Sequence, residues 1–142
     1  MRLEETKRSY HTGLFLFDGR KGQGEDFFLR RRVSKILRDL GVPEHLSGYS
    51  YLLEAVMMTI RDRTCLRKMT TSVYPHIGQK HQVSTASVER AMRHAVETGC
   101  IRCDPDVLFG YFGNTIDPDK GKPTNSEFIA RVADAVYQEV LS

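Results

Sequence analysis

The stretch from Pro75 to Gly99 constrains the fold most, because its pattern predicts two helices joined by a tight corner. Pro75 favours the first turn of a helix, since proline has no N–H and its φ is already fixed. A short helix to about His81 is then followed by a polar corner around Gln82. A short helix, a tight turn and a second helix make up the helix-turn-helix of many DNA-binding proteins.

The second helix of this stretch begins at a hydroxyl residue and has one apolar face. Ser84 can accept hydrogen bonds from the free N–H groups of the first turn, as N-cap residues do. The apolar face recurs at helical spacing and consists of Val88, Ala91, Met92, Ala95 and Val96. The residues that lie away from it are Ser87, Arg90, Arg93, His94 and Glu97. Basic side chains on that free face favour a helix that contacts DNA.

Positive charge is concentrated around the same stretch, although the net charge of the 142-residue chain is only +3. Residues 61–102 carry eight Lys and Arg against three Asp and Glu, a balance of +5, and residues 1–40 have a balance of +4. Residues 103–142 have a balance of −4. An excess of positive charge over the second helix indicates a nucleic-acid partner, but a solvated basic face would give the same count.

Apolar stripes predict further helices on both sides of the central stretch. They cover residues 25–40, 49–60 and 66–74, a short segment that begins at Asp104, and residues from about 125 onward. The first stripe consists of Phe28, Val33, Ile36, Leu37 and Leu40. We therefore predict an all-α domain of about six helices with a helix-turn-helix, winged-helix-like but without a clear sheet.

Local signals predict where several of these helices begin and end. Gly99 is expected to end the second helix of the central stretch, and residues 110–121 are expected to form a loop. Either Thr124 or Asn125 can cap the last helix, and Thr124 with Glu127 has the spacing of a capping box.

The first 25 residues are expected to be a leader or a flexible arm that precedes a helical domain over residues 26–142. Residues Leu14–Phe17 are compatible with a short strand, although no partner strand is evident. Residues Gly19–Gly24 are basic and rich in glycine, which suits either a disordered leader or an arm that contacts a minor groove or a phosphate.

Other classes of protein have less support. There is neither an apolar run of membrane-spanning length nor the apolar core of a signal peptide, so we expect a cytoplasmic protein without a membrane partner. We find no nucleophile and base beside a recognisable turn or Gly-rich loop, and no paired carboxylates in one apolar setting. We therefore expect neither an enzyme nor a catalytic residue, a small-molecule substrate or a cofactor.

One spacing is typical of zinc sites. Cys100 and Cys103 have the CxxC spacing of a metal knuckle, and His94 is close in sequence. A structural zinc site needs a second pair of ligands, for which the candidates are Cys65, His76 and His81 if the fold brings them near. Two ordinary thiols at the end of a helix are the simpler interpretation, and we predict no metal site.

Four stretches between about Val33 and Tyr137 carry a family resemblance. They are Gly41–Pro43 with Gly48–Leu52, then Val73–Pro75, Val88–Ala95 and Lys122–Ala130. In this order they resemble the C-terminal effector domain of the sporulation master response regulator, stage zero sporulation protein A, of endospore-forming bacteria. The resemblance implies a six-helix transcription factor that binds short promoter boxes on double-stranded DNA, with the second helix of its helix-turn-helix in the major groove.

The resemblance also implies which residues contact DNA. Glu89, Arg90, Arg93 and His94 stand where the family has its reader and backbone-contacting residues. Arg is suited to guanine and Glu can accept from cytosine N4, although Glu89 and Arg93 are also spaced for a surface ion pair. His94 can contact the DNA backbone or pack its ring. The interface is expected to include further residues from the corner and the loops: Ser84, Ser87, Lys80 and Lys122. Lys120, in the same loop as Lys122, is left open as a phosphate contact.

Three departures from the family pattern affect this interpretation. Ser87 stands where the family commonly has an arginine, the loop after residue 111 is slightly longer, and residues 1–32 are too few for a phosphoacceptor receiver domain. We therefore expect an effector domain whose DNA binding is not controlled by its own phosphorylation. The alternative is a protein-interaction or competitor module of the same fold that dimerises through the last helix. A homodimer on paired half-sites is compatible with either.

Overall fold

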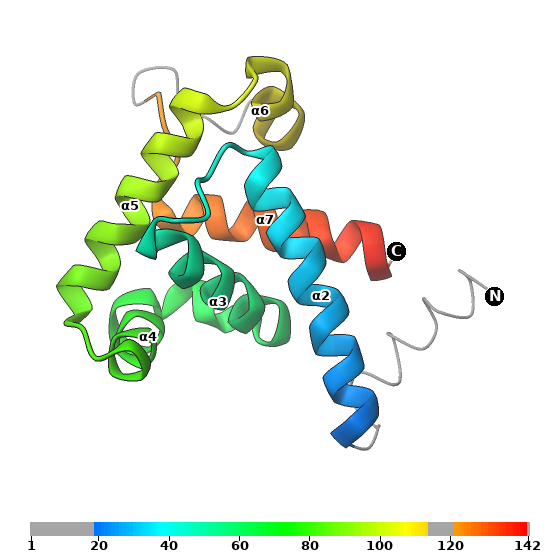
Figure 1. Cartoon of the computed structure of the whole chain (residues 1–142), viewed down its shortest axis with the longest axis vertical. Coiled ribbons are helices and arrows are strands. Elements are labelled where there is room, and N and C mark those ends of the chain that lie inside the picture. The colour runs from blue at the N-terminus through cyan, green and yellow to red at the C-terminus, as the bar shows by residue number, and fades with distance from the viewer. Residues whose placement is uncertain (1–18, 114–120, 142) are drawn as a thin grey trace.

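A computed structural model describes residues 19–113 and 121–141, and over these ranges the chain forms helices and no strand (Figure 1). The six α-helices are α2 (Gly19–Asp39), α3 (Ser47–Arg61), α4 (Tyr74–His81), α5 (Thr85–Arg102), α6 (Pro105–Phe112) and α7 (Asn125–Leu141). Between α3 and α4 lie a 3-10 helix, η1 (Arg63–Arg67), and a π-helix, η2 (Met69–Val73). The prediction of an all-α domain with about six helices is confirmed.

Helix α3 lies at the centre of the packing, because it contacts α2, α4, α5, α7 and η1. Its side chains Leu52, Ala55, Val56 and Met57 are almost completely buried. In Figure 1, α3 lies between α5 and α2, and α7 crosses the domain and contacts all three. The core therefore forms around α3, and the outward faces of α5 and α2 are left to solvent on two sides of it.

The buried stripe of α2 differs from the predicted one at its N-terminal end. Val33, Ile36 and Leu37 are buried as predicted, but Leu29 continues the stripe and Phe28 is 37% exposed. Leu29 is four residues before Val33 and lies on the same face, whereas Phe28 is displaced from Leu29 by about 100° around the helix.

Helix α2 begins earlier than expected. It begins at Gly19 rather than at Glu25, so the part of the expected leader that the structure describes is helical. The suggested strand at Leu14–Phe17 lies outside the described residues.

The helix predicted over residues 66–74 is wrong, because the backbone here changes its hydrogen-bonding pattern twice. The carboxylate of Asp62 accepts from the N–H of Thr64 at 3.0 Å and begins η1. The N–H of Val73 then donates to the carbonyl of Lys68 at 3.1 Å, the wider bond of a π-turn. This widening buries Met69 and Val73 against the core, which a regular helix of the same residues need not do.

Gly99 does not end α5, which continues to Arg102. The helix ends at Cys103, whose N–H donates to the Gly99 carbonyl at 2.8 Å. Gly99 is instead buried within the helix, where a Cβ atom would lie 2.8 Å from the carbonyl oxygen of Leu40. The missing side chain lets the loop that follows α2 pack directly on α5.

Candidate nucleic-acid interface

The corner between α4 and α5 is as tight as the sequence predicts. Gln82 adopts a left-handed conformation with φ of 60°, and the N–H of Val83 donates to the carbonyl of Gly78 at 2.9 Å. A Cβ atom on Gly78 would lie 2.6 Å from the Val83 carbonyl oxygen, so only glycine fits here without movement of the backbone. The two helices are thus held in one orientation by the chain that joins them.

The N-terminal end of α5 is capped as predicted. The Ser84 hydroxyl oxygen accepts from the N–H of Ser87 at 3.0 Å. The same hydroxyl donates to the side-chain oxygen of Ser87 at 2.9 Å. The residue that stands in place of the family arginine is therefore engaged in the cap of the helix.

The apolar face of α5 holds the helix on the domain, because Val88, Met92, Ala95 and Val96 are buried and Ala91 is partly buried. The free face shows the predicted polar residues. Arg90, Arg93 and His94 are exposed, and Glu89 and Ser87 are half-buried.

The arginines of the free face differ in their partners. Arg93 forms an ion pair with Glu89 one turn earlier, as the spacing of the two residues allows. Arg90 makes no hydrogen bond or ion pair with any residue that the structure describes. Of the two guanidinium groups, that of Arg90 is therefore the one that already points to solvent without a protein partner.

Asn125 connects α7 to both helices of the motif. Its Nδ2 atom donates to the Tyr74 hydroxyl oxygen of α4 at 3.1 Å and to the Glu89 carbonyl oxygen of α5 at 3.2 Å. Asn125 is 8% exposed. Burial raises the pKa of the Tyr74 phenol above its ordinary value.

Sequence reasoning considered Asn125 only as a possible cap. The cap is Thr124, whose Oγ1 accepts from the N–H of Glu127 at 3.1 Å, while Glu127 Oε1 accepts from the N–H of Thr124 at 2.8 Å. The predicted capping box is thus formed, and the Asn125 amide is free for its longer-range role.

Two lysines flank the free face of α5. Lys80 is exposed on α4, with Nζ 3.4 Å from a carboxylate oxygen of Glu54. The same oxygen lies 2.8 Å from Nε2 of His81. Lys122 lies on the other side, with Nζ 4.0 Å from Glu97, and lines a cleft of about 350 Å³ between α5 and the start of α7. Lys120 lies outside the described residues.

The structure therefore places seven of the eight predicted interface residues on one continuous part of the chain, and the eighth lies beyond it. The members that lie at the corner, on the cap or on α5 are Lys80, Ser84, Ser87, Glu89, Arg90, Arg93 and His94. Lys122 joins them across the cleft that Glu89, Arg93 and Glu97 line.

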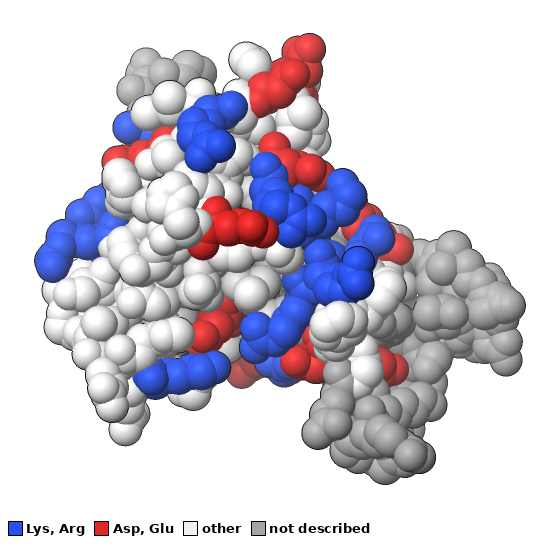
Figure 2. All heavy atoms as spheres, in the orientation of Figure 1, with Lys and Arg blue, Asp and Glu red and all other residues white. Residues whose placement is uncertain are grey.

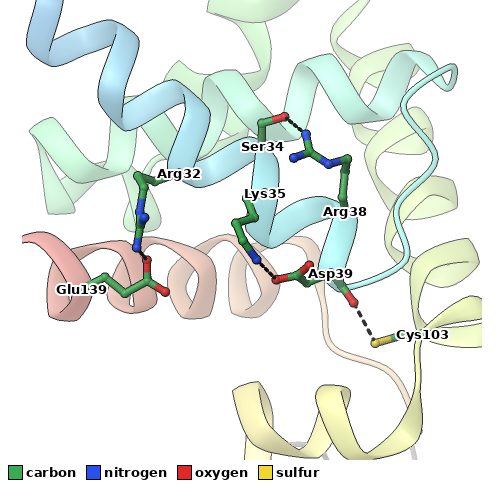
Figure 3. A network of polar contacts seen from close by, with 7 residues as sticks. All are labelled: Arg32, Ser34, Lys35, Arg38, Asp39, Cys103 and Glu139. Carbon is green, nitrogen blue, oxygen red and sulfur yellow. Dashed lines mark hydrogen bonds and ion pairs between the residues drawn. The ribbon is translucent and has the colours of Figure 1, made fainter.

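The cysteines have structural contacts. Cys103 Sγ donates to the carbonyl of Asp39 at 3.4 Å and so links the end of α5 to the end of α2 (Figure 3). Burial raises the pKa values of the Cys65, Cys100 and Cys103 thiols. Among the residues that the structure describes, no three His, Cys, Asp or Glu side chains gather closely enough to hold a metal ion.

Further basic residues belong to a different surface. In Figure 2 many of the visible Lys and Arg side chains gather over α2, on the other side of α3 from α5. Figure 3 shows that several of them have acidic partners: Arg32 pairs with Glu139 of α7, and Lys35 Nζ lies 3.1 Å from Asp39. In the described ranges no helix has the length and apolarity that crossing a membrane requires.

The chain matches a known protein family. The sequence model of the family described as sporulation initiation factor Spo0A C terminal matches residues 33–136. The matched span contains the whole helix-turn-helix, the cleft beside it and most of α7. It does not contain the N-terminal part of α2.

Proposed function

Because the chain belongs to the family of sporulation initiation factor Spo0A C-terminal domains, a family of DNA-binding effector domains, we propose that it regulates transcription by reading double-stranded DNA with α5. The observation that carries this proposal is the exposed guanidinium of Arg90, which has no partner among the described residues and lies in the first half of the helix. In a helix-turn-helix that part of the second helix contacts base edges.

The remaining residues fit two kinds of DNA contact. Arg93 and Glu89 lie one turn apart, so opening their ion pair offers a donor to guanine and an acceptor to cytosine. Ser84 and Ser87 lie at the positive end of the α5 dipole, which suits a backbone phosphate. Lys80, His94 and Lys122 flank the helix and fit further phosphate contacts.

The experiment that tests this proposal compares two duplexes. Fluorescence anisotropy of the 142-residue chain would be measured on a family-type promoter box and on a scrambled duplex across a salt series. A specific reader prefers the box and loses affinity for both duplexes steeply as the salt concentration rises. We expect Arg90→Ala to weaken binding to the box by about ten- to one-hundred-fold and to remove most of the preference.

Arg102→Ala is the matched control, because Arg102 is an exposed arginine at the opposite end of the same helix. It removes the same charge and should leave the preference for the box unchanged. Equal and weak binding to both duplexes would contradict specific reading. The alternative of a protein-interaction module of the same fold would then replace it, in line with the engaged side chain of Ser87 at the position of the family arginine.

A further inference from the structure

Two exposed apolar surfaces on the described chain have opposite charge. The first is the α2 surface, formed by Phe27, Phe28 and Arg31. Phe27 is 61% exposed and Phe28 is 37% exposed. Residues 27–38 include five Lys and Arg and no Asp or Glu. Four of these cations pair with acidic residues outside the segment, so the positive charge of this surface that has no ion-pair partner among the described residues is that of Arg31.

The α2 surface has the composition of an interface rather than of a solvated helix face. The guanidinium of Arg31 lies over the ring of Phe27 at 5.7 Å, and that of Arg32 lies over the ring of Phe28 at 5.9 Å. Arg31 forms no ion pair with any described residue, so its charge is available. Aromatic and arginine side chains are the residues most enriched at the energetic centres of protein interfaces.

The second surface, the α6 surface, is formed by Ile101, Asp104, Asp106 and Phe109. Ile101 is 79% exposed and Phe109 is 65% exposed. Asp104 and Asp106 are exposed, and neither forms an ion pair with another described residue. Residues 103–113 contain these two acidic groups and no Lys or Arg.

The two surfaces belong to different ends of the molecule. Figure 1 shows α6 beside the C-terminal end of α2, while the N-terminal end of α2 extends away from the rest of the domain. Figure 2 shows the basic side chains over α2 and acidic side chains at the end where α6 lies. A contact between the two surfaces therefore joins two copies of the chain.

We propose that the α2 surface of one copy docks on the α6 surface of a second copy, head to tail. Phe27 and Phe109 supply apolar contact, and Arg31 lies against the carboxylates of Asp104 and Asp106. Such a contact is heterologous, so each copy keeps one unused surface and a row of copies can form. Phe27, Phe28 and Arg31 precede the span that the family model matches, so this contact belongs to this chain rather than to the shared domain.

The proposal is tested without DNA, so the failure of DNA reading would not affect it. Sedimentation velocity of the full chain over a concentration series measures self-association. A first variant combines Phe27→Ser with Arg31→Ser, and a second combines Asp106→Ser with Phe109→Ser. We expect each variant alone to weaken self-association by about tenfold or more.

A mixture of the two variants gives the decisive result. Each variant keeps the surface that the other lacks, so the mixture should form a one-to-one dimer of near wild-type affinity that does not grow further. Tyr137→Ser is the control, because Tyr137 is an exposed aromatic residue on α7 that the contact does not use. Thermal unfolding of every variant checks that the fold is retained.

Three results would overturn the proposal. They are a wild-type chain that stays monomeric at the highest soluble concentration, a mixture of the two variants that stays monomeric while the wild type associates, and a loss of association caused by Tyr137→Ser alone. The last result would favour dimerisation through α7.

Discussion

The side-chain amide of Asn125 donates to the backbone carbonyl of Glu89 across 3.2 Å, and so ties the first residue of α7 to the N-terminal half of α5. The same amide donates to the Tyr74 hydroxyl at 3.1 Å. One buried side chain thus contacts both helices of the helix-turn-helix from a third element. The angle between α4 and α5 is therefore set by the corner at one end and by Asn125 along their length.

Replacement of Asn125 should destabilise the domain in a graded way. Asn125→Ala removes both hydrogen bonds and should lower the free energy of unfolding by about 1–3 kcal/mol, because the buried Tyr74 hydroxyl loses a partner. Asn125→Asp should cost more at neutral pH, because a carboxylate would face the Glu89 carbonyl oxygen.

Urea unfolding monitored by circular dichroism measures the free energy of unfolding of the wild type and of the two variants. The deficit of Asn125→Asp should shrink in acid, as the carboxyl becomes protonated and regains a donor. Equal stability of the Asp variant and the wild type at neutral pH would show that the amide does not make these bonds. Ser126→Ala, at the next and half-buried position, is the matched control.

A side chain at residue 78 should open the corner of the motif. In Gly78→Ala the new methyl group would lie 2.6 Å from the Val83 carbonyl oxygen, so the backbone must move and stability should fall by about 1–3 kcal/mol. DNA affinity should fall further than stability alone explains, because α4 and α5 change their relative orientation.

Gly24→Ala is the control for this substitution, since nothing lies within 4 Å of a Cβ atom at Gly24 on helix α2. Alanine is the better helix former, so this change should stabilise the chain by up to about 1 kcal/mol. The melting temperatures of the two variants should therefore shift in opposite directions from that of the wild type. A shift of both in the same direction would contradict the geometry of the corner.

Sequence reasoning succeeded where a structure is decided by neighbours along the chain. Ser84, Thr124 and Glu127 act as caps because a cap needs only the three or four residues that follow it. The apolar face of α5 followed from helical spacing for the same reason. These local signals located the whole helix-turn-helix before its geometry was known.

It failed where distant segments meet. Glycine is typical of a helix end, but Gly99 lies inside α5, where the carbonyl of Leu40, far away in the sequence, leaves no room for a side chain. Asn125 contacts residues 36 and 51 positions away, and periodicity carries no information about such pairs. The π-turn at Met69–Val73 likewise depends on which side chains the core accepts.

The ion pair between Glu89 and Arg93 should restrain DNA reading more than it stabilises the domain. It is a surface pair between residues one turn apart, which contributes about 0.3–0.5 kcal/mol. Glu89→Gln should therefore hardly change the melting temperature. It should free the Arg93 guanidinium and raise affinity for the scrambled duplex more than for the box, because the charged acceptor for cytosine N4 is replaced by a weaker, neutral amide oxygen. A competition assay with the two duplexes measures this ratio, and a change in melting temperature without a change in the ratio would contradict the assignment.

Ser87 offers the most direct comparison with the family, because it occupies the position of the family arginine while its hydroxyl bonds to the cap residue Ser84. Ser87→Arg keeps the backbone N–H that Ser84 accepts from, so the cap survives the change. An added fork-shaped donor at the start of α5 should raise affinity for a family-type box by about tenfold beyond the smaller gain that the added positive charge gives on a scrambled duplex. Ser87→Lys adds the same charge without the fork and should raise both affinities together. If arginine and lysine act alike on the two duplexes, residue 87 contacts phosphates and the base preference of α5 arises from Arg90 and its neighbours.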